Sequence, residues 1–190
     1  CTDPMAMLRI YGNRPLKTLA GSATRPTPAR VREAVFNIWQ GAVAGSRWLD
    51  LCAGCGAMGA EALCRGATEA LGIEQSAEAC RIIRQNWQLV AKDDQQFSVI
   101  RGDVRRQLTR LRQQSFDLIY FDPPYASDLY NPVLETIAAL QLLHPQGELA
   151  VEYSPDHWTP ISVSGLEVVR QKHYGKTHLV FYAPISTATG

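Results

Sequence analysis

Beyond Arg47, short apolar runs alternate along the chain with longer segments in which apolar residues recur at helical spacing. The apolar runs have the length of strands and occupy residues 48–51, 70–73, 97–100, 116–121 and 148–152. The amphipathic segments between them cover residues 57–65, 77–90, 104–111 and 131–143. This alternation predicts a doubly wound, Rossmann-like α/β fold in which a mostly parallel sheet carries helices on both faces.

Two further apolar runs, residues 166–172 and 177–182, lie near the end of the chain. Only His173-Tyr174-Gly175-Lys176 joins them, which leaves no room for a helix between them. We therefore expect these two runs to form an antiparallel hairpin at the edge of the sheet.

Residues 8–29 are rich in Gly, Pro, Thr and Arg without sustained periodicity, which predicts an irregular arm with room for a short hairpin. A helix is expected from Thr27-Pro28 to about Gln40, because proline suits the first helical turn and an apolar stripe follows it. We expect one compact domain in two parts. The first is a basic arm with its helix, residues 1–45, and the second is a cofactor-binding catalytic domain, residues 46–185.

The composition is that of one globular domain, with 46% hydrophobic residues in a chain of 190. No run of about 18 apolar residues is present, which argues against a membrane span and favours a cytoplasmic location. The net charge of +1 is unevenly distributed, because residues 1–47 hold seven Lys or Arg against two Asp or Glu. This basic arm favours a polyanionic partner, although a solvated surface with no partner is equally compatible with it.

A glycine-rich motif follows the first strand of the predicted sheet and opens a helix: Asp50-Leu51-Cys52-Ala53-Gly54-Cys55-Gly56-Ala57-Met58-Gly59. Glycines let the backbone turn tightly and approach a ligand closely. Glu74 ends the second strand, where its carboxylate would accept hydrogen bonds from ribose hydroxyls. The motif predicts a cofactor that contains a nucleoside, and on its own it does not exclude NAD.

Asp103 follows the third strand of the predicted sheet, at the same carboxyl edge where ligands of open α/β sheets bind. Its carboxylate could accept a hydrogen bond from an adenine amino group. A helix N-cap in Asp103-Val104-Arg105 explains the residue equally well.

Asp122-Pro123-Pro124-Tyr125 follows the fourth, buried strand. An aromatic amine is a weak nucleophile, and the Asp122 carboxylate and the Pro123 carbonyl can both accept its N–H groups and so aim its nitrogen. The prolines fix the backbone. Tyr125 offers a ring on which an extruded base can stack. The motif therefore predicts transfer of a group to an aromatic amine.

The Cys52-x-x-Cys55 pair also suggests a zinc or redox site. A structural zinc site needs four ligands, and no second Cys or His pair lies at a suitable spacing. We therefore expect no metal, and reduced thiols.

Together these motifs resemble those of the class I S-adenosylmethionine-dependent amino-methyltransferases. The segments Arg25-Pro26-Thr27, 30–38 and 59–67 narrow the resemblance to the RsmD-type bacterial 16S rRNA (guanine-N2)-methyltransferases, over about residues 8–183. The resemblance implies a seven-stranded sheet with one antiparallel edge strand, and methylation of a guanine exocyclic amine in small-subunit ribosomal RNA or a ribosomal particle. It also implies a monomer without metal.

The resemblance assigns roles to individual residues. For S-adenosylmethionine, the expected binding residues are Asp50, Ala53, Gly54, Gly56, Gly59, Glu74, Gln75, Asp103 and Val104. The expected catalytic residues are Asp122, Pro123, Pro124 and Tyr125, and the residues expected to contact RNA are Arg25, Thr27, Arg30 and Arg32.

Three other functions remain open on the sequence alone. A DNA amino-methyltransferase shares the Asp-Pro-Pro-Tyr chemistry, although no long segment is left over for reading a DNA sequence. A nicotinamide-dependent oxidoreductase explains the glycine loop but not Asp122-Pro123-Pro124-Tyr125. A non-catalytic RNA-binding assembly factor explains the basic arm, but it has no need of an intact catalytic motif.

Overall fold

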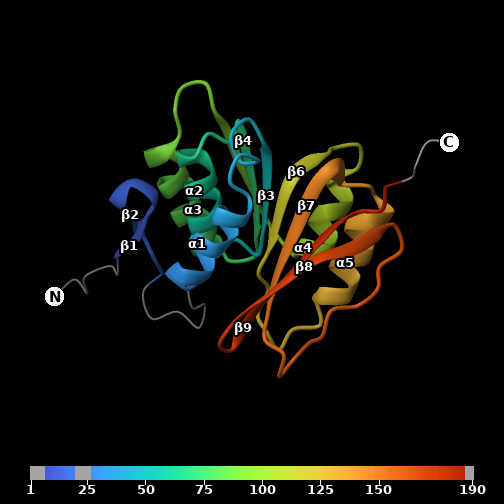
Figure 1. The fold of residues 1–190 in the computed structure, drawn as a ribbon. Helices are drawn as coiled ribbons and strands as arrows, with labels where there is room; N and C mark the ends of the chain where they lie inside the picture. Colours follow the sequence, from blue (N-terminus) through green and yellow to red (C-terminus); the bar gives the residue numbers. More distant parts are fainter. Residues whose placement is uncertain (1–6, 20–26, 187–190) are drawn as a thin grey trace.

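The computed structural model describes residues 7–19 and 27–186, and its centre is a seven-stranded sheet in the order β5-β4-β3-β6-β7-β9-β8 (Figure 1). The strands of this sheet are β3 (Arg47–Leu51), β4 (Glu69–Glu74), β5 (Gln96–Arg101), β6 (Phe116–Phe121), β7 (Leu143–Tyr153), β8 (Leu166–Tyr174) and β9 (Thr177–Pro184). The helices are α1 (Ala29–Ile38), α2 (Ala57–Cys64), α3 (Ala77–Val90), α4 (Val104–Leu108) and α5 (Tyr130–Ala139). Helices α1, α2 and α3 cover one face, and α4 and α5 cover the other.

The direction of the strands confirms the predicted fold class. The pairs β3–β4, β3–β6, β4–β5 and β6–β7 are all parallel. Strand β9 is the reversed strand, and it pairs antiparallel with β7 on one side and with the outermost strand β8 on the other. The hairpin expected at the sheet edge is therefore present, with its reversed strand on the inner side. No helix within the described residues is long and apolar enough to cross a membrane.

The boundary between α5 and β7 differs from the prediction, which extended the helix to Leu143. The helix ends at Ala139, and Gln141 adopts a positive φ of 51° just beyond it. Leu142 then donates its N–H back to the Ile137 carbonyl, which closes the helix end. The sequence hides this boundary because the residue with positive φ is a glutamine and the leucines around it continue the apolar spacing.

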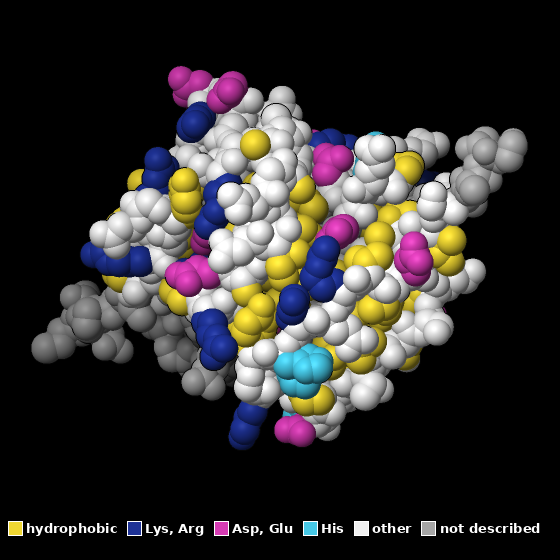
Figure 2. All heavy atoms as spheres, viewed as in Figure 1, with side chains coloured by type: hydrophobic (Ala, Val, Ile, Leu, Met, Phe, Trp, Pro, Cys, Tyr) yellow, Lys and Arg dark blue, Asp and Glu magenta, His cyan; other side chains and the backbone are white. Residues whose placement is uncertain are grey.

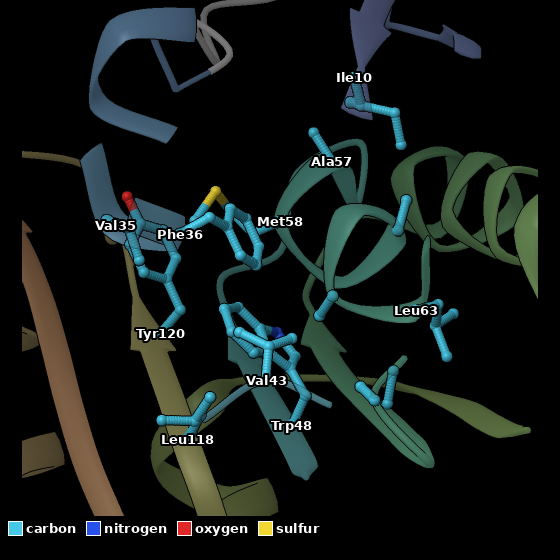
Figure 3. Packing of buried hydrophobic residues seen from close by; sticks show 14 of the residues in the cluster. Ile10, Val35, Phe36, Val43, Trp48, Ala57, Met58, Leu63, Leu118 and Tyr120 are labelled. Atoms are coloured by element: carbon cyan, nitrogen blue, oxygen red, sulfur yellow. The ribbon is translucent and has the colours of Figure 1, made fainter. Parts of the chain in front are cut away.

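Alternation of side chains along β3 and β6 builds two cores, one on each face of the sheet. Trp48 and Tyr120 point toward α1 and α2, whereas Leu49 and Ile119 point toward α4 and α5. On the first face the Trp48 ring stacks on Phe36 of α1, with ring centroids 5.4 Å apart (Figure 3). Burial of such large aromatic rings fixes helix α1 against the strands that carry the candidate site.

The N-terminal arm contains the short hairpin for which the sequence left room, β1 (Met7–Ile10) and β2 (Arg14–Lys17), linked by a 3-10 turn, Tyr11–Asn13. Ile10 and Leu16 are buried in the same core as Trp48. The Asn86 side chain of α3 exchanges hydrogen bonds with the backbone N–H and carbonyl of Lys17, each 2.9 Å long. The hairpin is therefore packed onto the body of the protein.

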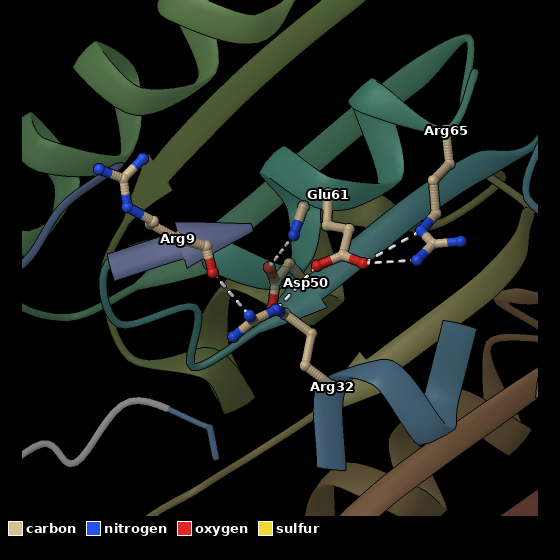
Figure 4. Close-up of polar contacts among 6 residues, drawn as sticks. Arg9, Arg32, Asp50, Glu61 and Arg65 are labelled. Carbon is tan, nitrogen blue, oxygen red and sulfur yellow. Dashed lines mark hydrogen bonds and ion pairs between the residues drawn. The ribbon is translucent and has the colours of Figure 1, made fainter. Parts of the chain in front are cut away.

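An ion pair inside the molecule connects α1 to α2 (Figure 4). Arg32 Nε lies 2.7 Å from Glu61 Oε2, and the two side chains are only 3% and 2% exposed. Arg32 also donates to the Arg9 carbonyl of β1, and Arg65 donates to the other Glu61 oxygen. The prediction that Arg32 contacts RNA is wrong. The Arg32 guanidinium is buried and binds Glu61 of α2 and the backbone of β1, so it is not available to a ligand.

Glu61→Ala is expected to lower the free energy of unfolding by about 3–5 kcal/mol, because it leaves the Arg32 guanidinium buried without a countercharge. The matched control is Glu69→Ala, which removes the partly exposed Arg47–Glu69 pair at the same 2.7 Å distance. That loss should stay below about 1 kcal/mol. Urea denaturation of both variants measures the difference, and equal losses would contradict the structural role of the buried pair.

Candidate active site at the carboxyl edge of the sheet

The pairing of β6 with β7 brings two carboxyl groups together at the carboxyl edge of the sheet. Phe121 pairs with Val151, so the next residue on each strand places Asp122 beside Glu152. Both side chains lie on the face that α1 covers, as does Tyr120 two residues earlier. Thr27, just before α1, donates its hydroxyl to Asp122 Oδ2 at 3.1 Å. The catalytic aspartate expected from the sequence and the expected RNA contact Thr27 are thus in direct contact.

Glu152 is the residue that sequence reasoning missed. Its side chain is 2% exposed and accepts hydrogen bonds from the hydroxyls of Tyr120 and Tyr125, the latter at 2.8 Å. The Tyr125 hydroxyl also lies 3.1 Å from Thr177 Oγ1 at the start of β9. The tyrosine of the motif is therefore tied to β7 and β9. The available signal was an acidic residue inside the apolar run of β7, because a buried glutamate is rare without a partner.

Burial raises the pKa of Asp122 well above its usual range, and the nearby charge of Glu152 raises it further. The Thr27 hydroxyl opposes this shift by donating to the carboxylate. Burial also raises the pKa of Glu152, against the two tyrosine hydroxyls that stabilise its ionised form. Neighbouring carboxyl groups resist ionising together, so Asp122 and Glu152 titrate as a pair.

The glycine loop, residues 52–56, is fastened to the end of β4. The N–H groups of Cys52 and Ala53 both donate to the Ile73 carbonyl, and Gly54 N donates to Glu74 Oε2 at 2.9 Å. Cys52 and Gly54 both adopt positive φ, 60° and 59°. A side chain added at Gly54 would have no neighbour within 4 Å, so the loop is open at this point. Such a combination of strain and openness is typical of a ligand-binding turn.

Asp50 supports this loop from inside. Its Oδ2 accepts the N–H of Gly59 at 3.0 Å, and the residue is 2% exposed (Figure 4). Burial raises the pKa of Asp50 to about 8, against the Gly59 hydrogen bond, which lowers it. Asp50 therefore holds the end of the loop through Gly59. The prediction that Asp50 contacts the cofactor directly is wrong, because its side chain is buried.

Trp87 of α3 explains two of the glycines. A Cβ at Gly59 would lie 2.3 Å from Trp87 Cζ2, and one at Gly56 would lie 2.8 Å from Trp87 Nε1. The same Nε1 donates to the Gly56 carbonyl at 2.8 Å. Gly59 is buried and serves the packing of α3 against α2, so the cofactor contact expected for Gly59 is wrong. Among the remaining expected cofactor residues, exposed surface is retained by Ala53, Gly54, Glu74, Gln75 and Asp103, whereas Gly56 and Val104 are buried.

Asp103 is the N-cap of α4, which was one of the two roles that the sequence predicted for it. Its carboxylate accepts the N–H groups of Arg105 and Arg106, and it pairs with the Arg105 guanidinium at 3.2 Å. The hydrogen bond from Arg105 lowers the pKa of Asp103, so this carboxylate is ionised at neutral pH. Its contact with an adenine amino group stays a prediction.

Four acidic residues from separate strand ends converge on the Cys52 thiol. Burial raises the pKa of this thiol far above its usual range, and the charges of Glu74, Asp122, Asp50 and Asp103 raise it further. The thiol therefore stays protonated. The glycine loop begins beside Asp122, because Leu51 pairs with Phe121 and the Asp122 N–H donates to the Leu51 carbonyl. In the described part of the chain, no group of three or more His, Cys, Asp or Glu could hold a metal ion.

The remaining predicted RNA contacts fall in different places. Arg25 lies outside the described residues. Arg30 is exposed on α1, and its guanidinium carbon lies 5.5 Å from the ring centroid of Tyr174 in the β8–β9 hairpin. In the catalytic motif, Pro124 is exposed and Tyr125 half-buried, whereas Pro123 is buried.

Known proteins are similar in sequence to this chain over most of their length. The family model described as "conserved hypothetical protein 95" matches residues 8–183. The chain is 32% identical to YlbH from Bacillus subtilis over 171 aligned residues. The aligned region covers 89% of this chain and 92% of YlbH. It is 27% identical over 173 residues to ribosomal RNA small subunit methyltransferase D from Haemophilus influenzae, which corresponds to 87% of this chain and 90% of that protein.

This chain belongs to the RsmD-type methyltransferase family. A solved structure agrees at the level of fold, since yhhF from Escherichia coli superposes on this RsmD-type chain with a TM-score of 0.81 at 24% identity. The superposition covers 94% of this chain and 98% of yhhF.

Gly59→Ala should destabilise this RsmD-type methyltransferase by about 3 kcal/mol, because the new methyl group overlaps the rigid Trp87 ring. Gly54→Ala should cost only about 1 kcal/mol, the strain of a side chain at positive φ in open space. The measurement is the urea midpoint of both variants. A larger loss for Gly54→Ala would contradict the assignment of Gly59 to packing.

Two substitutions should shift the acidic limb of the pH profile of kcat/KM for methyl transfer in opposite directions. Glu152→Gln removes a neighbouring negative charge, lowers the pKa of Asp122 and moves the limb to lower pH. Thr27→Val removes the donor to Asp122, raises that pKa and moves the limb to higher pH. Shifts in the same direction would show that Asp122 does not set the limb.

Proposed function

We propose that this RsmD-type methyltransferase transfers a methyl group from S-adenosylmethionine to the exocyclic amino group of a guanine in small-subunit ribosomal RNA. The observation that carries the proposal is the Asp122 carboxyl group, held by Thr27 at the carboxyl edge of the sheet beside the strand end that leads into the open glycine loop. The Haemophilus influenzae relative, named for its action on the small ribosomal subunit RNA, supports this substrate class.

The motif residues suit an aromatic amine in particular. An exocyclic amine has two N–H groups, and Asp122 and the Pro123 carbonyl offer one acceptor each. The Thr27 hydroxyl donates a hydrogen bond to Asp122 Oδ2, so the carboxyl group is already oriented before the substrate binds. As the nitrogen gains positive charge during transfer, Asp122 in its ionised form, which its raised pKa confines to the higher-pH side of the acidic limb, stabilises that charge and strengthens its hydrogen bond to the amine proton. A strong base is therefore not required.

The residues around the loop fit S-adenosylmethionine. When bound, this cofactor supplies a methyl group on a positively charged sulfur. The acidic side chains of Glu74 and Asp103 at this edge favour such a cation, and the open space at Gly54 leaves the backbone accessible to it. Glu74 would bind the ribose, although its two oxygens already accept Gly54 N and Ser76 N. Each carboxylate oxygen has a second lone pair for a ribose hydroxyl.

The adenine side of the cofactor would lie near Asp103, Val104 and Gln75. Asp103 retains exposed surface beyond its N-cap bonds, and Gln75 follows Glu74 at an exposed position. Tyr125 would stack the target base, and Arg30 would contact the RNA near it. The protein would act as a monomer in the cytoplasm, on free ribosomal RNA or on a small-subunit particle.

Asp122→Ala should reduce methyl transfer by more than about a thousandfold while changing the Kd for S-adenosylmethionine by less than about tenfold. The substrate is small-subunit RNA and particles from cells that lack this protein, and the readout is labelled methyl incorporated into RNA. Asp93→Ala, an exposed residue in the loop after α3, is the control and should transfer normally.

Two results would contradict the proposal. If the wild-type protein incorporated label into DNA and not into RNA, the proposed RNA substrate would be wrong. Full activity of Asp122→Ala would overturn the role of the carboxylate.

A further inference from the structure

The tip of the β8–β9 hairpin lies at the same edge of the sheet as the candidate active site. Strand β9 runs antiparallel to β7, and β8 runs antiparallel to β9, so β8 ends at the carboxyl edge where Asp122 is located. The contact between Thr177 Oγ1 and the Tyr125 hydroxyl joins the hairpin directly to the catalytic motif. His178, the next residue, pairs with Tyr153 at the end of β7.

The hairpin tip is basic and aromatic. Residues 171–178 contain two lysines, two histidines and a tyrosine, and no acidic residue. Lys172, His173 and Lys176 are exposed, and the His173 ring stacks on His178 with centroids 4.2 Å apart. Figure 2 shows dark-blue and cyan side chains over this hairpin and beside it toward the start of α1. Such a surface attracts phosphate groups.

Helix α1 completes this surface from the other side. The Arg30 guanidinium lies over the Tyr174 ring, and Arg30 is only three residues from Thr27, which holds Asp122. The Arg30–Tyr174 pair therefore joins the start of α1 to the hairpin tip beside the candidate site. Aromatic rings and guanidinium planes are the groups on which unpaired RNA bases stack.

We propose that the hairpin-tip surface, formed by Arg30, Lys172, His173, Tyr174 and Lys176, binds the RNA strand that adjoins the target guanine. Lys172 and Lys176 bind phosphates, and the Arg30–Tyr174 pair stacks a neighbouring unpaired base. This inference rests on the proposed function, because it takes the base beside Asp122 to belong to RNA. The exposed apolar residues Val168 and Val169 lie further along β8, outside the tip, and the tip itself offers charge and ring faces.

Lys176→Glu tests the phosphate contact. Its Kd for protein-free small-subunit ribosomal RNA should rise about tenfold, and the slope of log Kd against log salt should fall by roughly 1. The KM for RNA should rise in parallel, with kcat and the Kd for S-adenosylmethionine within about twofold of wild type. Lys92→Glu makes the same charge change in the exposed loop after α3, at the opposite edge of the sheet, and should change none of these values.

Tyr174→Ala tests stacking. It should weaken RNA binding about tenfold without changing the salt slope, because a ring is lost and no charge is removed. Tyr174→Phe keeps the ring and should bind RNA like wild type, and an unchanged Kd of Tyr174→Ala for S-adenosylmethionine would show that its weaker RNA binding is not a loss of folding.

The outcomes distinguish a failure of the hairpin-tip surface from a failure of the proposed function. Wild-type affinity in both Lys176→Glu and Tyr174→Ala would overturn the hairpin-tip surface. Defects seen only with the protein-containing particle, and not with free RNA, would also overturn it, in favour of a contact with a ribosomal protein. If wild type labels no ribosomal RNA but the variants still weaken its RNA binding, the proposed function fails, and the hairpin tip remains an RNA-binding surface without a target guanine beside it.

Discussion

The site depends on the hydrogen-bonded register between the parallel strands β6 and β7. That register places Asp122 beside Glu152 on one face, where two carboxyl groups would normally be unfavourable. The arrangement is tolerated because the hydroxyls of Thr27, Tyr120 and Tyr125 donate to the pair. A one-residue slip in the register would move both carboxyl groups to the opposite face, away from α1.

The same register explains how the protein prepares an acceptor for an amine. Asp122 is oriented by Thr27, and Tyr125 is held by Glu152 and Thr177, so the motif is fixed by three separate segments of the chain. The glycine loop is fixed independently, through Asp50 inside and Trp87 behind it. Groups that are oriented before the substrate arrives lose little freedom on binding, which is the main source of catalysis in a reaction that depends on positioning.

Local patterns in the sequence predicted much of this fold. Helix α3 and strand β6 begin and end at the predicted residues, because their apolar spacing is regular and their ends carry Ser76 and Asp122-Pro123. The position of Asp122 followed from its place after a buried strand. Asp103 as an N-cap was also visible, because its type and spacing before α4 are local signals.

What the sequence did not reveal depends on contacts between distant segments. Glu152 meets Tyr125 across 27 residues and Arg32 meets Glu61 across 29, and no local pattern encodes either pairing. Arg32 looked like a basic arm residue because charge alone predicts exposure. Gly59 looked like a cofactor residue because the steric need for a glycine comes from Trp87, which lies in a different helix.

The most direct test of the central claim is the chemical identity of the methylated nucleoside. Small-subunit RNA methylated by the wild-type protein would be digested to nucleosides and analysed by mass spectrometry against standards. The geometry at Asp122 predicts a methyl group on an exocyclic amine, and the proposed function predicts that this amine is N2 of guanosine. A methyl group on a ring nitrogen, a ring carbon or the ribose would contradict the account, because Asp122 and Pro123 would then have no amine to hold.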